Sequence, residues 1–248
     1  MVKTVAVAVA RMVADLVDYL DMQHAHLLDY KHFVHTLRSL GAQMHHAQTV
    51  HVSLMDAWSE EYRKFHTLQH LANCLHHLEQ DRWGGLIDGP DRGRLALALW
   101  FSDAICTSDS YNHEAQGAEW AENSMRLLGI PQNNIDIVVG LVLCTKPGAR
   151  IESLRHAWMH DIVVHNLGLP YEQFVASSNA WRAELSWVDD LNYRRGMDIF
   201  LKRFIQAITV FKTEAGQTDY EENANYNISQ ALQSLHNLQV SLTLPEPS

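Results

Sequence analysis

The feature that most constrains the fold of this 248-residue chain is the repeated spacing of apolar residues at i, i+3 and i+4. Such a stripe forms one face of an amphipathic helix, whereas a half-buried strand alternates apolar and polar residues. Helical stripes cover residues 5–20, 54–62, 68–78, 95–105, 118–128, 135–144, 154–164, 171–187, 197–211 and 220–240. No run of alternating strands is apparent. We therefore expect an all-α protein, a single bundle of about nine or ten helices.

Turn signals separate the stripes, but none is long enough to be an interdomain linker. Examples are Trp83-Gly84-Gly85, Asp88-Gly89-Pro90, Gly129-Ile130-Pro131, Lys146-Pro147-Gly148 and Gly168-Leu169-Pro170. We expect a helical extension at residues 1–45, one helical domain at residues 46–240 and a tail at residues 241–248. The extension is rich in histidine (His24, His26, His32, His35, His45 and His46), for which we expect packing or solvated roles.

Charge and cysteine content exclude several classes of protein. The net charge of -10 argues against a nucleic-acid or acidic-membrane binder, because a phosphate-reading surface needs excess Lys and Arg. Cys74, Cys106 and Cys144 are odd in number and widely spaced, which argues against a disulfide framework. The apolar run from Val5 to Ala10 is too short for a membrane span or a typical signal sequence. We expect a cytoplasmic protein; its oligomeric state is left open.

Histidines and aspartates on several stripes could meet around a metal ion. His66 and His70 are one helical turn apart and share a face. Asp103 follows the apolar run from Leu95 to Phe101, and a carboxylate in such a place must find a partner or a metal. His and Asp side chains from different helices form metal sites in the interior of helical bundles. His156, His160 and Asp161 make a further such group.

The order of these segments resembles a known family. The segments are Arg63-Lys64-Phe65-His66-Thr67-Leu68-Gln69-His70, Trp100-Phe101-Ser102-Asp103, His113-Glu114, Thr145-Lys146, Asp161 with Leu167-Gly168, and Arg182 with Glu184. From about residue 50 to about residue 238 the chain resembles the HD-domain superfamily of metal-dependent phosphohydrolases. It is most similar to a bacterial subgroup of predicted HD phosphohydrolases.

The resemblance implies a divalent metal (Mn, Mg, Zn, Ni or Fe) that activates water against a small phosphate ester or a nucleotide. His66, Asp103 and Asp161 would be metal ligands, and His70 is a candidate replacement for the histidine that Ser102 displaces. Asp103 or Glu114 would orient or deprotonate the water. The expected phosphate-binding residues are Arg63, Lys146 and Arg182.

Several positions depart from the family pattern and leave alternatives open. Ser102 and Gly148 stand where histidines are expected, Gly117 stands where a serine is expected, and His113, Val163 and Asn225 also differ. The three remaining ligands, His66, Asp103 and Asp161, can still hold a metal with open positions, and a weaker, altered or absent metal is the alternative. One alternative is a metal-free pseudoenzyme that binds a small ligand or a protein partner. Another is an iron-dependent oxygenase of the same fold, which would have to recruit further ligands such as His113, His156 and His160.

Overall fold

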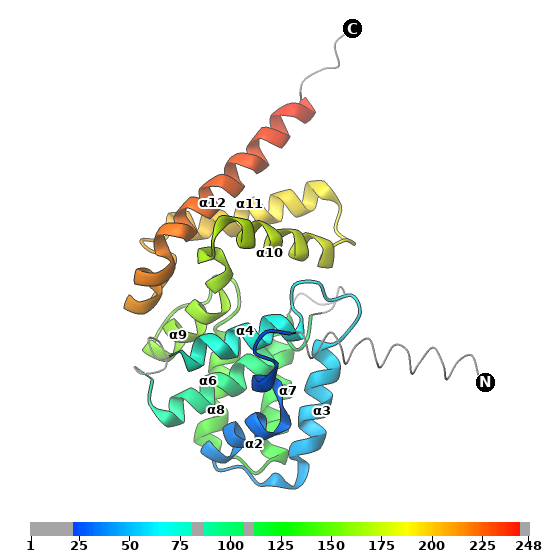
Figure 1. Cartoon of the computed structure of the whole chain (residues 1–248), viewed down its shortest axis with the longest axis vertical. Helices are drawn as coiled ribbons and strands as arrows, with labels where there is room; N and C mark the ends of the chain where they lie inside the picture. The colour runs from blue at the N-terminus through cyan, green and yellow to red at the C-terminus, as the bar shows by residue number, and fades with distance from the viewer. Residues whose placement is uncertain (1–21, 81–86, 107–111, 244–248) are drawn as a thin grey trace, which may run out of the picture.

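The computed structural model describes residues 22–80, 87–106 and 112–243, with side-chain burial up to residue 237. This part of the chain has ten α-helices, three short 3-10 helices and no strand, which confirms the predicted fold class (Figure 1). The elements are η1 (Ala25–Leu28), α2 (Tyr30–Ser39), η2 (Met44–His46), α3 (Ala47–Trp58), α4 (Leu68–Glu79), α6 (Gly89–Ser102), α7 (His113–Leu127), α8 (Gln132–Leu143), α9 (Leu154–Val163), η3 (His165–Gly168), α10 (Tyr171–Glu184), α11 (Asp190–Gln206) and α12 (Glu214–Thr243). Within the described ranges, no helix combines the length and the apolar character that crossing a bilayer requires.

Helix α6 lies at the centre of the larger hydrophobic cluster and contacts α2, α4, α7, α8 and α9. Every residue from Leu95 to Ser102 is buried, which explains why this run shows no polar face. The indole N–H of Trp58, at the end of α3, donates to the carbonyl oxygen of Trp100 over 2.9 Å. The end of α6, where Asp103 follows, is therefore fixed by packing on several sides.

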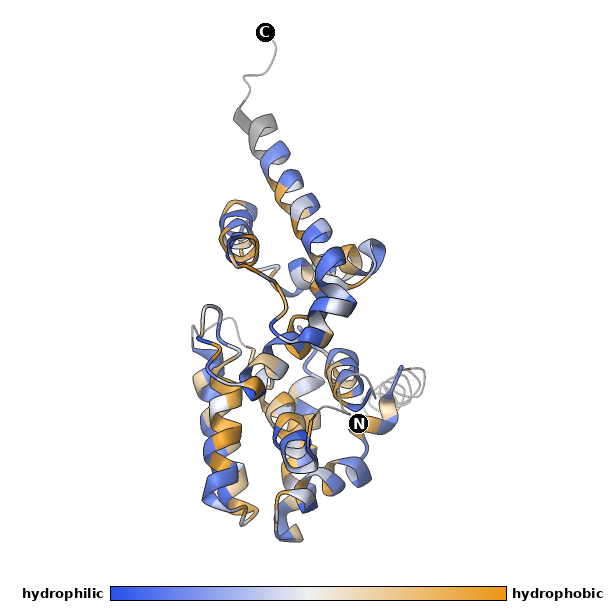
Figure 2. Cartoon of the chain, turned by 90° about the vertical axis from the view of Figure 1, so that its left-hand side faces the viewer, coloured by the Kyte–Doolittle hydropathy of each residue, from blue (hydrophilic) through white to orange (hydrophobic). Residues whose placement is uncertain are grey.

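A second, smaller hydrophobic cluster lies among η3, α10, α11 and α12, in the upper part of Figure 1. Its buried members are Leu167, Phe174, Leu201, Val210, Phe211, Ala224 and Ile228. Tyr220 of α12 packs against both clusters. Figure 2 shows apolar and polar residues interleaved along α12, whose later turns project beyond the other helices. The region around η3 and Tyr220 thus connects the two clusters.

The described part of the predicted extension packs into the larger cluster. Leu27 and Leu28 of η1 and Phe33 and Leu37 of α2 are all almost fully buried there. Helix α2 contacts both α3 and α6, so the packing continues past residue 45 without a break. The helix predicted at residues 5–20, the turn at Gly84-Gly85 and the last five residues of the tail lie outside the described residues.

Candidate functional site

The candidate site is built around Glu184, the last residue of α10. Its Oε2 accepts hydrogen bonds from the backbone N–H groups of Lys64, Phe65 and His66 at 2.8, 2.8 and 2.9 Å. Its Oε1 lies 2.5 Å from Nδ1 of His66. Although burial favours the neutral acid, the hydrogen bond from His66 and those from the backbone hold the pKa of Glu184 far below its usual range. Glu184 is therefore a buried carboxylate that fixes the segment before α4.

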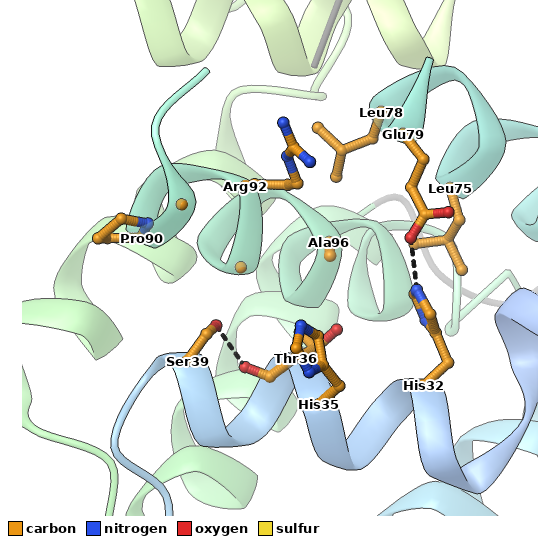
Figure 3. Close-up of a pocket in the computed structure, with 12 residues that line it drawn as sticks. His32, His35, Thr36, Ser39, Leu75, Leu78, Glu79, Pro90, Arg92 and Ala96 are labelled. Carbon is orange, nitrogen blue, oxygen red and sulfur yellow. Dashed lines mark hydrogen bonds and ion pairs between the residues drawn. The ribbon is translucent and has the colours of Figure 1, made fainter. Parts of the chain in front are cut away.

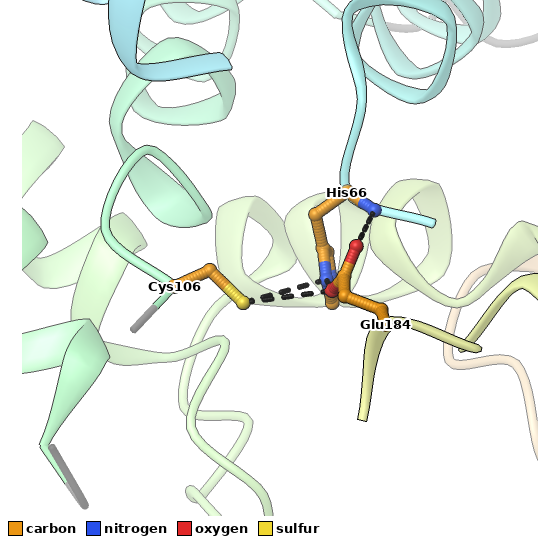
Figure 4. A group of neighbouring side chains, drawn as sticks. All are labelled: His66, Cys106 and Glu184. Atoms are coloured by element: carbon orange, nitrogen blue, oxygen red, sulfur yellow. Dashed lines mark hydrogen bonds and ion pairs between the residues drawn. The ribbon is translucent and has the colours of Figure 1, made fainter. Parts of the chain in front are cut away.

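His66 stands between three acidic or weakly acidic side chains. Its Nε2 lies 3.8 Å from Oδ1 of Asp103. Cys106 approaches the other side of the ring, with Sγ 3.7 Å from Nδ1 of His66 and 3.6 Å from Oε1 of Glu184 (Figure 4). Burial opposes protonation of the imidazole, but Asp103, Cys106 and Glu184 together raise the pKa of His66 well above its ordinary value.

The side chains of His66, Cys106 and Glu184 could hold a metal ion. Their ligand atoms all lie within 4.8 Å of one another. Among the described residues, these three form the group of His, Cys, Asp or Glu side chains that lies close enough together to hold a metal. Asp103 is close to His66 but is not part of the group, nor are His70 and Asp161. Cys106 and Glu184 belong to no local metal-binding spacing in the sequence. Glu184 is part of the Arg-x-Glu segment that resembles the family pattern, together with Arg182, but that resemblance does not predict what the carboxylate of Glu184 binds.

Asp161 of α9, an expected metal ligand, instead holds the start of α12. Oδ1 accepts the backbone N–H of Lys212 at 2.7 Å and lies 3.0 Å from Nδ1 of His160. Oδ2 accepts the backbone N–H of Thr213 at 2.7 Å and its hydroxyl at 2.8 Å. The carboxylate is fully buried. All four donors come from the protein, so Asp161 does not fit the metal set implied by the family resemblance.

The guanidinium of Arg63 is also used within the protein. The side chain is 1% exposed. It donates to the carbonyl oxygens of His66, Asp103 and Ala104 at 3.1, 2.7 and 2.8 Å, and to Glu60 at 3.2 Å. These bonds occupy most of its five N–H donors. Arg63 therefore has little left for a phosphate, and it acts instead as a tie between the segments that carry His66 and Asp103.

The remaining predicted residues are dispersed. Arg182 donates to the carbonyl oxygens of Leu185 and Val188 in the loop after α10, and to Asp190. Lys146 is exposed after α8, and Glu114 is half-buried in the first turn of α7. Ser102 is buried, with its hydroxyl 3.2 Å from the carbonyl oxygen of Leu99 and 3.2 Å from Oδ2 of Asp103.

Three buried histidines lie beside the site: His70 and His77 on α4, and His165 in η3. The ring centroids of His77 and His165 are 4.3 Å apart, and those of His70 and His165 are 6.1 Å apart. Burial, followed by the proximity of His165, lowers the pKa of His77 to about 2. Burial lowers the pKa of His165 to about 4, although its Nδ1–H donates to the carbonyl oxygen of Ile162. Burial also lowers the pKa of His70 well below its usual value, so all three rings are neutral near neutral pH.

The free energy of unfolding is expected to fall as the pH drops below 6.5, the ordinary pKa of histidine. Because the folded-state pKa of His165 is depressed, the unfolded chain binds more protons in this window, and the stability is fully present only above it. For His165 alone the loss is about 2 kcal/mol between about pH 6.5 and about pH 4.5. Urea unfolding at these two pH values should show a smaller loss in His165→Gln than in the parent, and equal losses would contradict this assignment. Because the pKa of His66 is raised, its contribution to the free energy of unfolding changes mainly above pH 6.5, outside this window.

A cavity of about 450 Å³ opens between α2, α4 and the first turns of α6 (Figure 3). Leu75, Leu78 and Ala96 give it an apolar side, and His32, His35, Glu79 and Arg92 give it a charged side. His32 and Glu79 are bonded to each other over 2.6 Å, and this hydrogen bond lowers the pKa of Glu79 against the opposing effect of burial. The volume falls within the range of small-molecule sites.

Comparisons of the chain with protein-family models, with curated proteins and with solved structures found no match. The resemblance to HD phosphohydrolases therefore rests on the sequence motifs, and membership of that family stays a prediction.

Proposed function

We propose that this chain is a non-hydrolytic binding protein on a helical scaffold similar to that of the HD phosphohydrolases. The observation that carries the proposal is the use of Asp161: both of its oxygens accept backbone N–H groups at the start of α12. A phosphohydrolase needs that carboxylate for its metal, and a phosphate needs cationic side chains with donors to spare. The donors of Arg63 and Arg182 go largely to backbone carbonyl groups instead.

The cavity between α2, α4 and α6 is the place we propose for the ligand. Its apolar side suits a hydrocarbon or aromatic body. The guanidinium of Arg92 and the imidazole of His35 line the charged side together with the bonded pair of His32 and Glu79, and we propose that the two cationic or polar groups bind an anionic group on the ligand. The first turn of α6 lines the same wall and adds the positive end of its helix dipole. We therefore expect a small molecule with an apolar body and an anionic end, bound in the cytoplasm.

The iron-dependent alternative gains no support from the positions of its candidate ligands. Nδ1 of His160 is bonded to Asp161, and Nδ1 of His156 lies 3.4 Å from the backbone N of Glu152. Neither histidine belongs to the group formed by His66, Cys106 and Glu184. That alternative stays a prediction of the family resemblance alone.

The first test is for hydrolysis. The untagged full chain is incubated with a phosphomonoester, a phosphodiester and the common nucleotides, in turn with Mn, Mg, Co, Ni and Zn. We expect no turnover above that of a double variant, His66→Ala with Asp103→Ala. Turnover by the parent that this double variant lacks would overturn the proposal and restore the metal-dependent hydrolase.

The second test is for the ligand class, with octanoate, octyl phosphate and octanol as probes in calorimetric titrations. Octanoate or octyl phosphate should bind more tightly than octanol, because only the first two carry a charge for Arg92. Arg92→Gln should weaken the two anionic probes at least about fivefold and leave octanol unchanged. The matched control is Arg126→Gln, since Arg126 is an exposed arginine of α7 paired with Glu122. Equal binding of all three probes, or none, would contradict a site for anionic ligands.

A further inference from the structure

We infer that His66, Cys106 and Glu184 form a site for a zinc-class divalent metal ion that fastens three segments of the fold together. His66 comes from the segment before α4, Cys106 follows the end of α6, and Glu184 ends α10 (Figure 4). The inference does not depend on the small-molecule cavity, which is lined by α2, the last turns of α4 and the first turns of α6. The inferred site shares His66 with the metal set that the family resemblance implies, but not Asp103 or Asp161.

Two of the three distances within the group match those around a tetrahedral ion. A zinc ion bound by a thiolate sulfur, an imidazole nitrogen and a carboxylate oxygen holds sulfur about 3.5 Å from each of the other two atoms. Sγ of Cys106 lies 3.7 Å from Nδ1 of His66 and 3.6 Å from Oε1 of Glu184. The nitrogen and oxygen are closer, at 2.5 Å, because the Nδ1 proton of His66 forms a hydrogen bond between them. A metal that replaces this proton needs to widen that one separation by less than about 1 Å.

The position differs from the one expected for a hydrolase. The inferred ion binds Nδ1 of His66, whereas Asp103 faces Nε2 on the opposite side of the ring. A metal shared by His66 and Asp103 would therefore lie elsewhere. The two positions can be separated by experiment, because Asp103 matters for one of them and Cys106 for the other.

The site is rigid and its charges balance. Three backbone N–H groups hold Oε2 of Glu184, which leaves Oε1 directed at the metal position. Arg63 holds the carbonyl oxygens of His66 and Asp103, and so fixes the segments that carry two of the ligands. Binding of M²⁺ releases the thiol proton of Cys106 and the Nδ1 proton that His66 donates to Glu184. The resulting thiolate and carboxylate neutralise the two positive charges of the ion.

The ligand set also selects the metal. A thiolate with an imidazole favours Zn²⁺, Co²⁺, Ni²⁺ or Fe²⁺ over Mg²⁺ or Ca²⁺, which prefer oxygen ligands. Three protein ligands leave one further position. Because the three residues come from segments next to both hydrophobic clusters, the ion is expected to stabilise the contact between α10 and the larger cluster. Zn²⁺ should therefore raise the melting temperature by about 5 °C when it is in large excess over its dissociation constant.

The test is a titration of the untagged full chain with Co²⁺, followed by displacement with Zn²⁺. We expect a thiolate-to-cobalt charge-transfer band that saturates at one equivalent and is lost when Zn²⁺ is added. Cys106→Ala should lose the band and bind Zn²⁺ at least about tenfold more weakly, with unchanged circular dichroism. The matched control is Cys144→Ala, since Cys144 is a buried thiol that donates to the carbonyl oxygen of Leu141. It should keep both properties.

Asp103→Asn decides between the two metal positions. The charge-transfer band and the Zn²⁺-dependent rise in melting temperature should persist in Asp103→Asn if the ion binds Nδ1 of His66. Three outcomes would overturn the inference: no cobalt band in the parent, a band that survives in Cys106→Ala, or metal binding that is lost in Asp103→Asn but kept in Cys106→Ala. The second of these would identify an adventitious site elsewhere on this histidine-rich chain.

Discussion

Asp161→Asn is expected to lower the free energy of unfolding by about 3 kcal/mol. Asparagine has the size of aspartate, so the substitution creates no cavity. It supplies one acceptor oxygen, whereas each carboxylate oxygen of Asp161 now receives a backbone N–H, one from Lys212 and one from Thr213. Whichever way the amide is turned, one N–H at the start of α12 loses its acceptor, either the partly buried one of Lys212 or the buried one of Thr213. Urea unfolding monitored by circular dichroism measures the effect.

The matched control is Asp136→Asn on α8, since Asp136 is exposed and accepts a single side-chain bond from Gln132. Its expected change is within about 0.5 kcal/mol. If Asp161→Asn were as stable as the parent but lost a bound divalent metal, the role implied by the family resemblance would be right and the capping role wrong. A large loss of stability in a metal-free buffer supports the cap.

Most of the helices could be predicted because they carry their own apolar stripe, but α2, Tyr30–Ser39, matches none of the predicted stripes. The stripe at residues 68–78 corresponds to α4, Leu68–Glu79, where Thr67 caps the first turn with its hydroxyl. The stripe at residues 54–62 fits less well, since α3 covers Ala47–Trp58. The chain turns after Trp58 so that Arg63 can reach the end of α6. The hydrogen bond from Arg63 to Asp103 joins residues that are forty positions apart. A local spacing of apolar residues cannot predict such a contact.

Two departures from the family pattern have a packing reason that the sequence did not reveal. A Cβ atom on Gly117 would lie 2.7 Å from the carbonyl oxygen of Phe101, so α7 approaches α6 too closely for a side chain. Gly148 has a φ of +88°, a conformation that favours glycine over histidine. These positions therefore reflect local backbone geometry, and their difference from the family says little by itself about lost chemistry.

The candidate site could be predicted only in part. The sequence marks His66 and Asp103, and the structure places them side by side. The sequence cannot distinguish a metal ligand from a helix cap when a carboxylate is buried, because either a metal ion or backbone N–H groups can offset the cost of burying it. For Asp161 the choice depends on backbone groups about fifty residues later, and for Glu184 on groups more than a hundred residues earlier. The spacing of residues along the chain cannot predict these long-range contacts.

Arg63→Met is expected to lower the free energy of unfolding by about 3 kcal/mol. Methionine keeps much of the apolar stem but offers no donors, so the carbonyl oxygens of His66, Asp103 and Ala104 lose their shared partner. The stacking of the guanidinium over Trp58 is lost as well. Arg63→Lys should recover only part of the loss, because one ammonium group cannot reach both segments in the fork geometry of arginine. Urea unfolding of both variants gives the two values.

The neighbouring Lys64 provides the control, because it is exposed and its ammonium group donates only to the carbonyl oxygen of Glu61. Lys64→Met should change the stability by less than about 0.5 kcal/mol. The comparison also separates the two roles considered for Arg63. A phosphate clamp would leave stability unchanged and weaken the binding of a phosphorylated ligand, whereas a tie between segments lowers the stability and weakens any metal held by His66 and Cys106. A stable Arg63→Met protein with intact cobalt binding would therefore contradict both the tie and the rigid site that depends on it.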